Sequence, residues 1–209
     1  MVAKYSTMEP LVNSSPTFLI AGLGNPGREY KASRHNIGFM LVSHLAEELG
    51  VTFSRVQSKA LVTKIEYQGS RLILAKPQTY MNLSGQAIGS LVKFYKIEFD
   101  HLLVVYDDVD LPYGRIRMRP SGGSAGQKGM RSIIDQLGTQ EFPRMRLGIG
   151  RPPGSKGAAS YVLRDFSGED AEFLPSVLDR GVEAVLTYIR EDLTTAMNLY
   201  NSKTDDEAG

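Results

Sequence analysis

The stretch Phe18-Leu-Ile-Ala-Gly-Leu-Gly-Asn-Pro-Gly27 decides the fold class. Its first six residues are apolar or small and do not alternate with polar ones, which is typical of a strand buried on both faces of a sheet. The glycines, asparagine and proline that follow are turn formers and predict the end of the strand. A second run of this kind, Leu102–Tyr106, ends at Asp107. Two such strands indicate an α/β protein whose sheet is covered by helices on both sides.

The spacing of apolar residues predicts the remaining elements. Further strands are expected at 60–67, 71–75, 115–119 and 144–149. Stripes of helical period predict helices that end near Gly50, Tyr95, Gly138, Ile189 and Tyr200. Asn36 is in position to cap the first of these helices, which begins at Ile37. The expected fold is a single-domain three-layer sandwich: a central twisted mixed, partly parallel sheet with helices on both faces.

Composition and length agree with one domain. The chain has 209 residues, of which 42% are hydrophobic and 22% charged, as in soluble globular proteins. Residues 1–16 lack periodicity and predict a disordered leader, 17–201 form the domain, and 202–209 read as an acidic tail. No apolar stretch is long enough for a membrane span. Cysteine is absent, which excludes disulfides and a thiolate nucleophile.

The net charge of +1 hides a local imbalance. Residues 105–151 contain eight basic and five acidic residues, a balance of +3, whereas residues 160–209 contain four basic and eleven acidic ones, a balance of −7. Such a chain has no polybasic coat, but it has room for a local nucleic-acid site. The basic residues expected to contact RNA are Arg115, Arg117, Arg119, Lys128, Arg131, Arg144, Arg146 and Arg151. The simpler alternative is a solvated basic face.

Two glycine-rich motifs are only weak evidence of a nucleotide-binding site or of a serine nucleophile. The letters Gly22-Leu-Gly-Asn-Pro-Gly27 match a dinucleotide fingerprint, but no apolar helix opens at the third glycine, and the proline removes a phosphate-binding N–H. The stretch Gly122-Gly-Ser-Ala-Gly126 matches a nucleophile elbow. However, a basic segment ending in proline precedes it, and all three histidines lie before Ser124. Nucleotide binding remains a minor alternative, and serine catalysis is not expected.

Metal catalysis is also weakly supported by the sequence. Asp107, Asp108 and Asp110 could hold Mg²⁺ through one or two carboxylates. No His-x-x-x-His pair is present, and there is no cysteine to form a zinc site. We therefore expect no metal and no cofactor.

Polar residues follow three of the predicted strands at the ends where ligands bind in open α/β sheets. Asn25 and His35 follow the first strand, Tyr80 and Asn82 the strand that ends at residue 75, and Asp107 the strand from Leu102. A histidine oriented by a carboxylate is a general base near neutral pH, and water would be its nucleophile. The alternatives are ordinary ones: a turn asparagine, a helix cap and a structural ion pair.

These residues lie in motifs that resemble bacterial-type peptidyl-tRNA hydrolase. The resemblance extends from Phe18 to Asn201 and keeps its motifs in order. They are Gly22-Leu-Gly24-Asn25-Pro26-Gly27-x-x-Tyr30, Arg34-His35-Asn36-x-Gly38, Lys76-Pro-x-Thr79-Tyr-Met-Asn82-x-Ser84-Gly85, Asp107-Asp-Val-Asp110-Leu-Pro112, Gly122-Gly123-x-x-Gly126-x-x-Gly129 and Arg144-x-Arg146-x-Gly148-Ile-Gly150-Arg-Pro.

The resemblance implies hydrolysis of the ester between peptide and tRNA, without a metal, which recycles tRNA after premature release from the ribosome. It implies that His35 is the catalytic base and Asp107 its orienting partner. The substrate-binding residues that it implies are Asn25, Tyr30, Tyr80, Asn82 and Lys128, and the residues for the tRNA 5′ phosphate are Arg119 and Arg146. A cytoplasmic monomer that binds peptidyl-tRNA and no membrane is expected, or an organellar one if the source is eukaryotic.

One position departs from the family pattern. The family usually has His-Asn in the glycine-rich loop, where this chain has Gln127-Lys128. A lysine would not hold a water as an asparagine does, so we expect Lys128 to bind substrate and not to act in catalysis. The departure leaves open an alternative function: a non-catalytic RNA-binding relative that resembles organellar intron-splicing factors.

Overall fold

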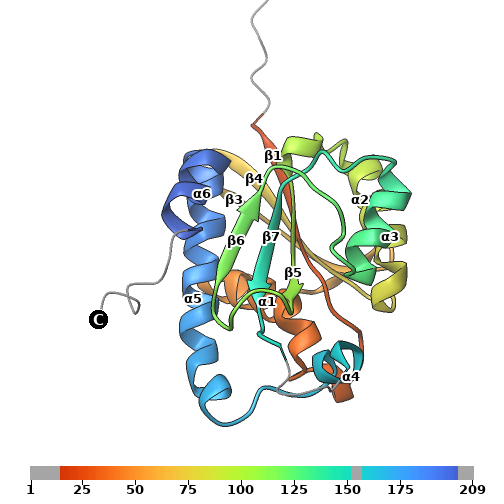
Figure 1. Ribbon diagram of the computed structural model, residues 1–209. Helices are drawn as coiled ribbons and strands as arrows, with labels where there is room; N and C mark the ends of the chain where they lie inside the picture. The colour runs from red at the N-terminus through yellow and green to blue at the C-terminus, as the bar shows by residue number, and fades with distance from the viewer. Residues whose placement is uncertain (1–14, 152–156, 202–209) are drawn as a thin grey trace, which may run out of the picture.

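A computed structural model describes residues 15–151 and 157–201 (Figure 1). The strands are β1 (Thr17–Gly22), β2 (Arg55–Gln57), β3 (Ala60–Tyr67), β4 (Ser70–Pro77), β5 (Leu102–Asp108), β6 (Ile116–Arg119) and β7 (Arg144–Gly148). The helices are α1 (Ile37–Glu48), α2 (Ser84–Tyr95), α3 (Lys128–Leu137), α4 (Ala158–Val162), α5 (Glu169–Arg190) and α6 (Leu193–Tyr200). Short 3₁₀ turns are η1 (Arg28–Tyr30), η2 (Arg34–Asn36), η3 (Met81–Leu83) and η4 (Phe99–His101). Most of the expected leader and all of the expected tail lie outside the described residues.

The strands form one mixed sheet in the order β2-β3-β4-β1-β5-β7-β6. The four inner strands β4, β1, β5 and β7 are parallel, whereas β2, β3 and β6 pair antiparallel at the two sides. Every residue of β5 is buried, as the apolar run predicted. The parallel register joins Gly22 of β1 to Val105 of β5. The carboxyl ends of these two strands therefore lie at the same edge.

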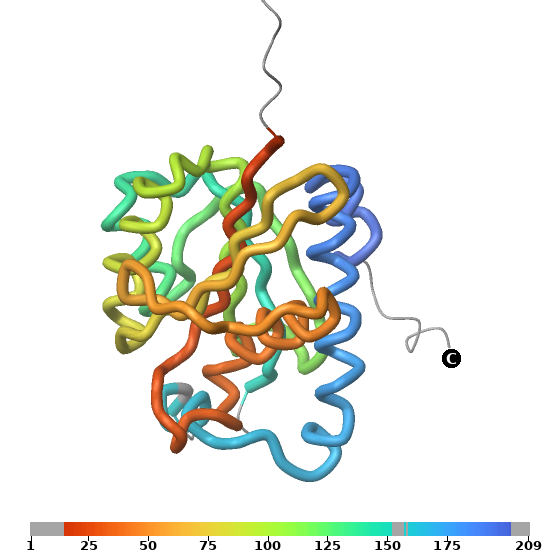
Figure 2. Tube along the Cα trace, turned by 180° about the vertical axis from the view of Figure 1, so that it is seen from behind, coloured from red at the N-terminus to blue at the C-terminus, as the bar shows by residue number. Residues whose placement is uncertain are grey.

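Helices cover both faces of the sheet, which confirms the three-layer sandwich. One core cluster joins the sheet to α1, α5 and α6 through residues such as Leu41, Val182 and Ala196. The other joins it to α2 and α3 through residues such as Leu91 and Met130. Figure 1 shows α5 and α6 at one side of the sheet and α2 and α3 at the other. Figure 2 shows the β3–β4 hairpin and α1 from behind.

Two glycines bring α1 directly against the ends of β1 and β5. A Cβ at Gly22 would lie 2.1 Å from the carbonyl oxygen of Gly38, and a Cβ at Gly38 would lie 2.4 Å from that of Val105. Real side chains do not allow such distances, so only glycine permits this approach. The turn η2, which precedes α1, consequently lies beside the end of β5, with His35 in it.

The basic face of β6 and β7 is not covered by a helix in the view of Figure 1. The antiparallel register pairs Arg117 with Arg146 and Arg119 with Arg144, so these four side chains share one face of the sheet. The intervening apolar residues, such as Met118, are buried in the other face. The predicted alternation of basic and apolar residues along β6 is therefore confirmed.

Some local predictions were wrong. The Asn36 side chain does not cap α1 but bonds to the backbone of Asn25. Helix α5 begins at Glu169, before the predicted apolar stripe that starts at Leu174, because acidic residues fill its first turn and favour a helix N-terminus there. The elements β2 and α4 had no apolar pattern and were not predicted.

Candidate active site

The structure joins His35 and Asp107 at the carboxyl end of the sheet. Nδ1 of His35 lies 2.8 Å from Oδ2 of Asp107, and both side chains are largely buried. With Nδ1 as the N–H donor to the carboxylate, Nε2 carries the lone pair and can take a proton. The sequence prediction that these two residues meet is confirmed by this geometry.

A second residue holds the same carboxylate, and sequence reasoning overlooked it. Nε2 of Gln127 donates to Oδ1 of Asp107 at 3.1 Å, and Oε1 of Gln127 accepts from the N–H of Met130 at 2.8 Å. The second bond caps α3 and directs the amide nitrogen toward Asp107. A polar residue three positions before the first buried residue of a helix stripe was the signal that could have identified this cap.

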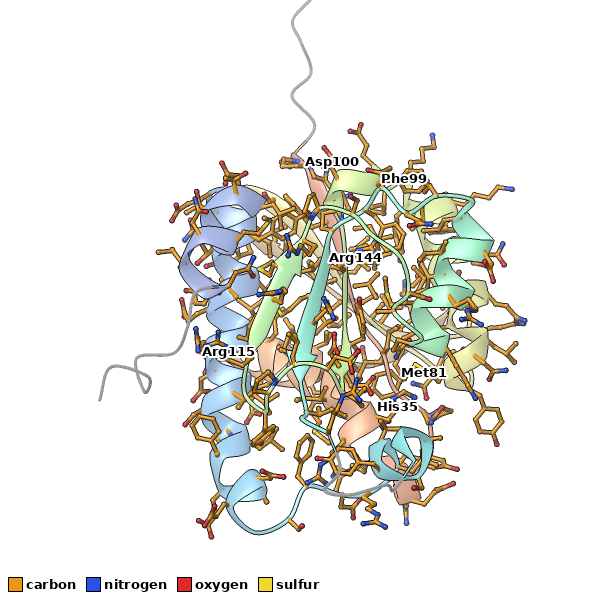
Figure 3. The ribbon with its side chains drawn as sticks, in the orientation of Figure 1. His35, Met81, Phe99, Asp100, Arg115 and Arg144 are labelled. Carbon is orange, nitrogen blue, oxygen red and sulfur yellow. The ribbon has the colours of Figure 1, made fainter. Side chains whose placement is uncertain are left out.

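Asn25 is fixed by its side chain and by its backbone. Its Oδ1 accepts from the N–H of Met81 at 2.8 Å, and the Asn36 side chain bonds to its backbone N–H and carbonyl. Because Oδ1 is engaged, the free donor of Asn25 is its Nδ2. Figure 3 shows Met81 and His35 at the same end of the sheet, and Asn82 follows Met81 in η3.

Arg34 anchors the turn that carries His35. Its guanidinium pairs with Asp170 at 2.6 Å and lies over the rings of Tyr161 and Phe166 at 4.8 and 5.0 Å. It also bonds to the carbonyl of Asp165. These contacts join η2 to α4, to the segment that follows it and to the first turn of α5, all of which lie far along the chain. The sequence does not reveal this role of Arg34.

The remaining predicted substrate-binding residues lie near these elements and are more exposed. Tyr30 is half-buried in η1. Tyr80 and Asn82 are exposed at η3, and Lys128 is exposed at the first position of α3. The residue that contacts Asp107 from the glycine-rich loop is thus Gln127 and not Lys128.

The acidic residues after Leu102–Tyr106 do not share a cation site. They have three different partners: Asp107–His35, Asp108–Arg146 and Asp110–Arg151. Across residues 15–151 and 157–201, no three His, Cys, Asp or Glu side chains are grouped so that they could hold a metal ion.

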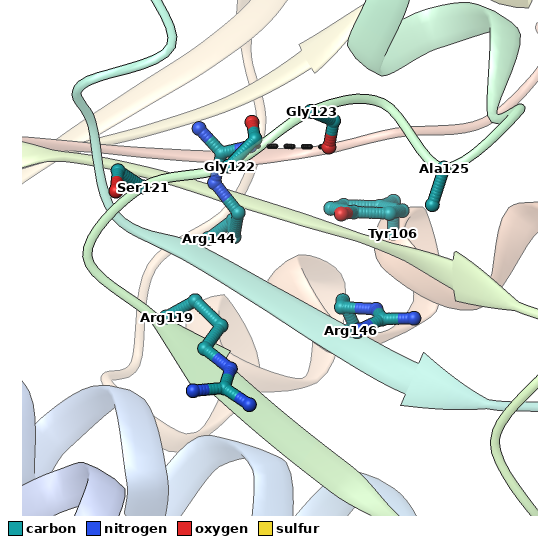
Figure 4. A pocket seen from close by; sticks show the side chains of 8 residues that line it. All are labelled: Tyr106, Arg119, Ser121, Gly122, Gly123, Ala125, Arg144 and Arg146. Carbon is teal, nitrogen blue, oxygen red and sulfur yellow. Dashed lines mark hydrogen bonds between the residues drawn. The ribbon is translucent and has the colours of Figure 1, made fainter.

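A cavity of about 410 Å³ lies beside the carboxyl end of β5. Figure 4 shows its lining: Tyr106, Arg119, Ser121, Gly122, Gly123, Ala125, Arg144 and Arg146. No acidic residue is among them, so the cavity offers hydrogen-bond donors and positive charge to a ligand. The ion pair with Asp108 engages Nε of Arg146 and leaves its terminal nitrogens available.

Arg144 differs from the other basic residues expected to contact RNA. It is 2% exposed, and its guanidinium donates to the carbonyls of Gly122, Gln140 and Phe142. This arginine therefore holds the glycine-rich loop against β7. Because its donors are already used within the protein, Arg144 is less available to a phosphate than Arg119 or Arg146.

The fold and this cluster define a class: an α/β protein with a histidine–carboxylate pair at the end of its parallel strands and an arginine-lined cavity beside it. A family model described as peptidyl-tRNA hydrolase matches residues 19–208. The chain is 52% identical over 185 residues to the peptidyl-tRNA hydrolase of Chloroflexus aggregans, with 88% of this chain and 98% of that protein covered. This chain belongs to the peptidyl-tRNA hydrolase family.

More distant relatives agree. The chain is 46% identical over 187 residues to a chloroplastic peptidyl-tRNA hydrolase of Arabidopsis thaliana, with 89% of this chain and 65% of that protein covered. The crystal structure of peptidyl-tRNA hydrolase from Acinetobacter baumannii superimposes with a TM-score of 0.84 at 32% identity, and the match covers 90% of this chain and 96% of that one. Within the described residues, no helix is both long and apolar enough to cross a membrane.

Proposed function

We propose that this protein hydrolyses the ester bond that joins a peptide to tRNA, and so returns tRNA to translation after premature release from the ribosome. The observation that carries the proposal is the buried pair of His35 and Asp107, 2.8 Å apart, at the strand ends beside Asn25. The matching family model and the named relatives support the same activity.

The reaction needs a general base, an activated water and a group that stabilises negative charge. Nε2 of His35 takes a proton from water as the water oxygen bonds to the ester carbonyl carbon. The carbonyl oxygen becomes an oxyanion, for which Nδ2 of Asn25 or the Asn82 amide is a donor. When the intermediate collapses, the bond to the ribose oxygen breaks, and His35 returns the proton to that oxygen. Asp107 stabilises the imidazolium in between.

The arginine-lined cavity supplies the binding site for the tRNA 5′ phosphate. Arg119 is exposed, and its side chain makes no hydrogen bond or ion pair with another described residue; Arg146 has its terminal nitrogens available. The guanidinium groups fit a phosphate through paired donors. The part of the substrate near His35 is the ester with its peptide and the tRNA 3′ end. Its contacts would come from Lys128, Tyr30 and Tyr80.

A non-catalytic RNA-binding role is the second candidate function. The exchange at Gln127-Lys128 favours it, but the intact catalytic pair and the fixed Asn25 favour the enzyme. We further propose that the protein acts as a monomer in the cytoplasm, or in an organelle if its source is eukaryotic.

An assay of ester hydrolysis tests the proposal. N-acetylated aminoacyl-tRNA is incubated with the protein and a chelator, and release of the acylated amino acid is followed. We expect turnover that the chelator does not reduce. No turnover, together with tight binding of deacylated tRNA, would instead support the non-catalytic role. Dinucleotide binding at Gly22–Gly27, measured by calorimetry, would revive the nucleotide alternative.

A further inference from the structure

Tyr106 is a buried tyrosine whose hydroxyl has no protein partner. The residue is 2% exposed and lines the arginine cavity. Its hydroxyl makes no hydrogen bond with any residue in the described ranges, in contrast to the buried hydroxyl of Tyr188, which donates to the carbonyl of Asp100. The hydroxyl oxygen is not among the described side-chain atoms that are buried without a partner, so it opens onto the cavity. The hydroxyl of Tyr106 therefore has unused capacity at the wall of a cavity.

The charged residues that line the cavity around this hydroxyl are arginines. Figure 4 shows the hydroxyl end of the ring facing the middle of the cavity, between Gly123, Arg144 and Arg146. Burial raises the pKa of Tyr106 to about 12; the charges of Arg144 and Arg146 act in the opposite direction, and those of Asp108 and Asp107 act with burial. The phenol is consequently neutral at physiological pH and presents an O–H donor beside two arginines. A negatively charged oxygen is the ligand that such a donor fits.

Three successive residues at the end of β5 serve neighbouring sites. Asp107 contacts His35. Tyr106 lines the cavity together with Arg146, and Asp108 pairs with Arg146. Asp108 is buried and holds Nε of Arg146. The strand thus fixes the cavity and the histidine pair relative to each other, with no loop between them.

We propose that the Tyr106 hydroxyl is a direct ligand of the tRNA 5′-terminal phosphate, together with the guanidinium groups of Arg119 and Arg146. The inference rests on the proposed function, which already assigns the cavity to that phosphate. Tyr106 adds a neutral, rigid donor from the floor of the cavity, and the adjacent position of Asp107 on the same strand relates the phosphate to the ester. In an acceptor stem the 5′ end pairs close to the 3′ end that carries the ester.

The experiment compares two substrates and two enzymes. N-acetylated aminoacyl-tRNA is prepared with a 5′ phosphate or, after phosphatase treatment, with a 5′ hydroxyl, and kcat/KM is measured for wild type and Y106F. We expect the wild type to prefer the phosphorylated substrate. In Y106F this preference falls by about tenfold, the size of one hydrogen bond to a charged group. The fall should reside mainly in KM.

Y188F is the matched control, since it removes a tyrosine hydroxyl elsewhere in the core. It should keep the wild-type preference and lower the melting temperature, because the carbonyl of Asp100 loses its donor. Y106F should melt no lower than wild type, because its hydroxyl has no protein partner to lose.

Three outcomes overturn the inference: an unchanged preference in Y106F, an equal loss on both substrates, or a wild type indifferent to the phosphate. A wild type inactive on both substrates would instead reject the proposed function.

Discussion

Gln127 joins the N-terminus of α3 to the carboxylate that holds His35: its amide nitrogen lies 3.1 Å from Oδ1 of Asp107. Since Oδ2 of the same carboxylate contacts His35 at 2.8 Å, both oxygens are held. The carboxylate cannot rotate without loss of one bond. Gln127 is therefore a positioning residue in this structure, while its neighbour Lys128 is exposed.

Q127S separates the two contacts of Gln127. Serine is among the best helix N-caps, so α3 stays capped, but its hydroxyl is too short to reach Asp107. We expect kcat to fall about tenfold, the value of one hydrogen bond to a charged group, with little change in KM.

The melting temperature of Q127S serves as the control and should stay close to that of wild type. If the variant keeps the wild-type kcat, Gln127 acts only as a helix cap and its bond to Asp107 is without consequence for the reaction.

Asn25 offers a test that separates stability from activity. N25D keeps an oxygen to accept from Met81 but replaces the free amide with a carboxylate oxygen. We expect a folded protein with at least a hundredfold lower kcat, because an oxyanion donor is replaced by a negative charge. N25A leaves the buried N–H of Met81 without a partner and should cost about 1–3 kcal/mol of unfolding free energy. The measurements are thermal unfolding and ester hydrolysis of both variants. Wild-type activity in N25D would contradict the role of Asn25 as an oxyanion donor.

The arginines of the cavity should determine the salt dependence of tRNA binding. In R119A and R146A, we expect weaker binding of tRNA and a slope of log K against log salt that is shallower by about one. Hydrolysis of small ester substrates should be spared. R71A is the control, because Arg71 pairs with Glu66 on the distant β3–β4 hairpin. Slopes equal to that of wild type would remove Arg119 and Arg146 from the phosphate site.

Asp192 gives a pH-dependent contribution to stability. Its carboxylate caps α6 through the N–H of Thr195, and this hydrogen bond lowers the pKa of Asp192 below its ordinary 3.8. A lowered carboxyl pKa stabilises the fold above the ordinary value, and the contribution is lost as pH falls through the folded value. We expect wild type to melt higher than D192A at neutral pH, and the difference to vanish in acid below the folded pKa. Melting curves of the two proteins across this range, with D192N as an uncharged cap, provide the measurement.

The layers and the contact between His35 and Asp107 could be predicted from the sequence because they depend on local patterns. Phe18–Leu23 and Leu102–Tyr106 are apolar without interruption. The polar residues that follow such parallel strands meet at one edge of the sheet, however far apart they are in the sequence. Asn25, His35 and Asp107 were therefore brought together by a rule about sheets, without knowledge of any contact.

The side-chain partners could not be predicted in the same way. Arg144 and Arg146 look equivalent in the sequence, yet the guanidinium of Arg144 donates to the backbone carbonyls of Gly122 and Gln140. The contact of Gln127 with Asp107 and the clasp of Asn201 on the backbone of Met118 join residues distant along the chain. Such pairs depend on the exact placement of loops and helix ends, for which short apolar patterns carry no information.

The most direct test of the account is the rate of ester cleavage by H35A, with and without added imidazole. His35 is largely buried beside a fixed carboxylate, so truncation opens a space in which free imidazole can act as the base. We predict that kcat of H35A on N-acetylated aminoacyl-tRNA falls by at least a hundredfold and that imidazole partly restores it, in proportion to its neutral form. Wild-type turnover by H35A without imidazole would contradict the assignment of His35 as the catalytic base.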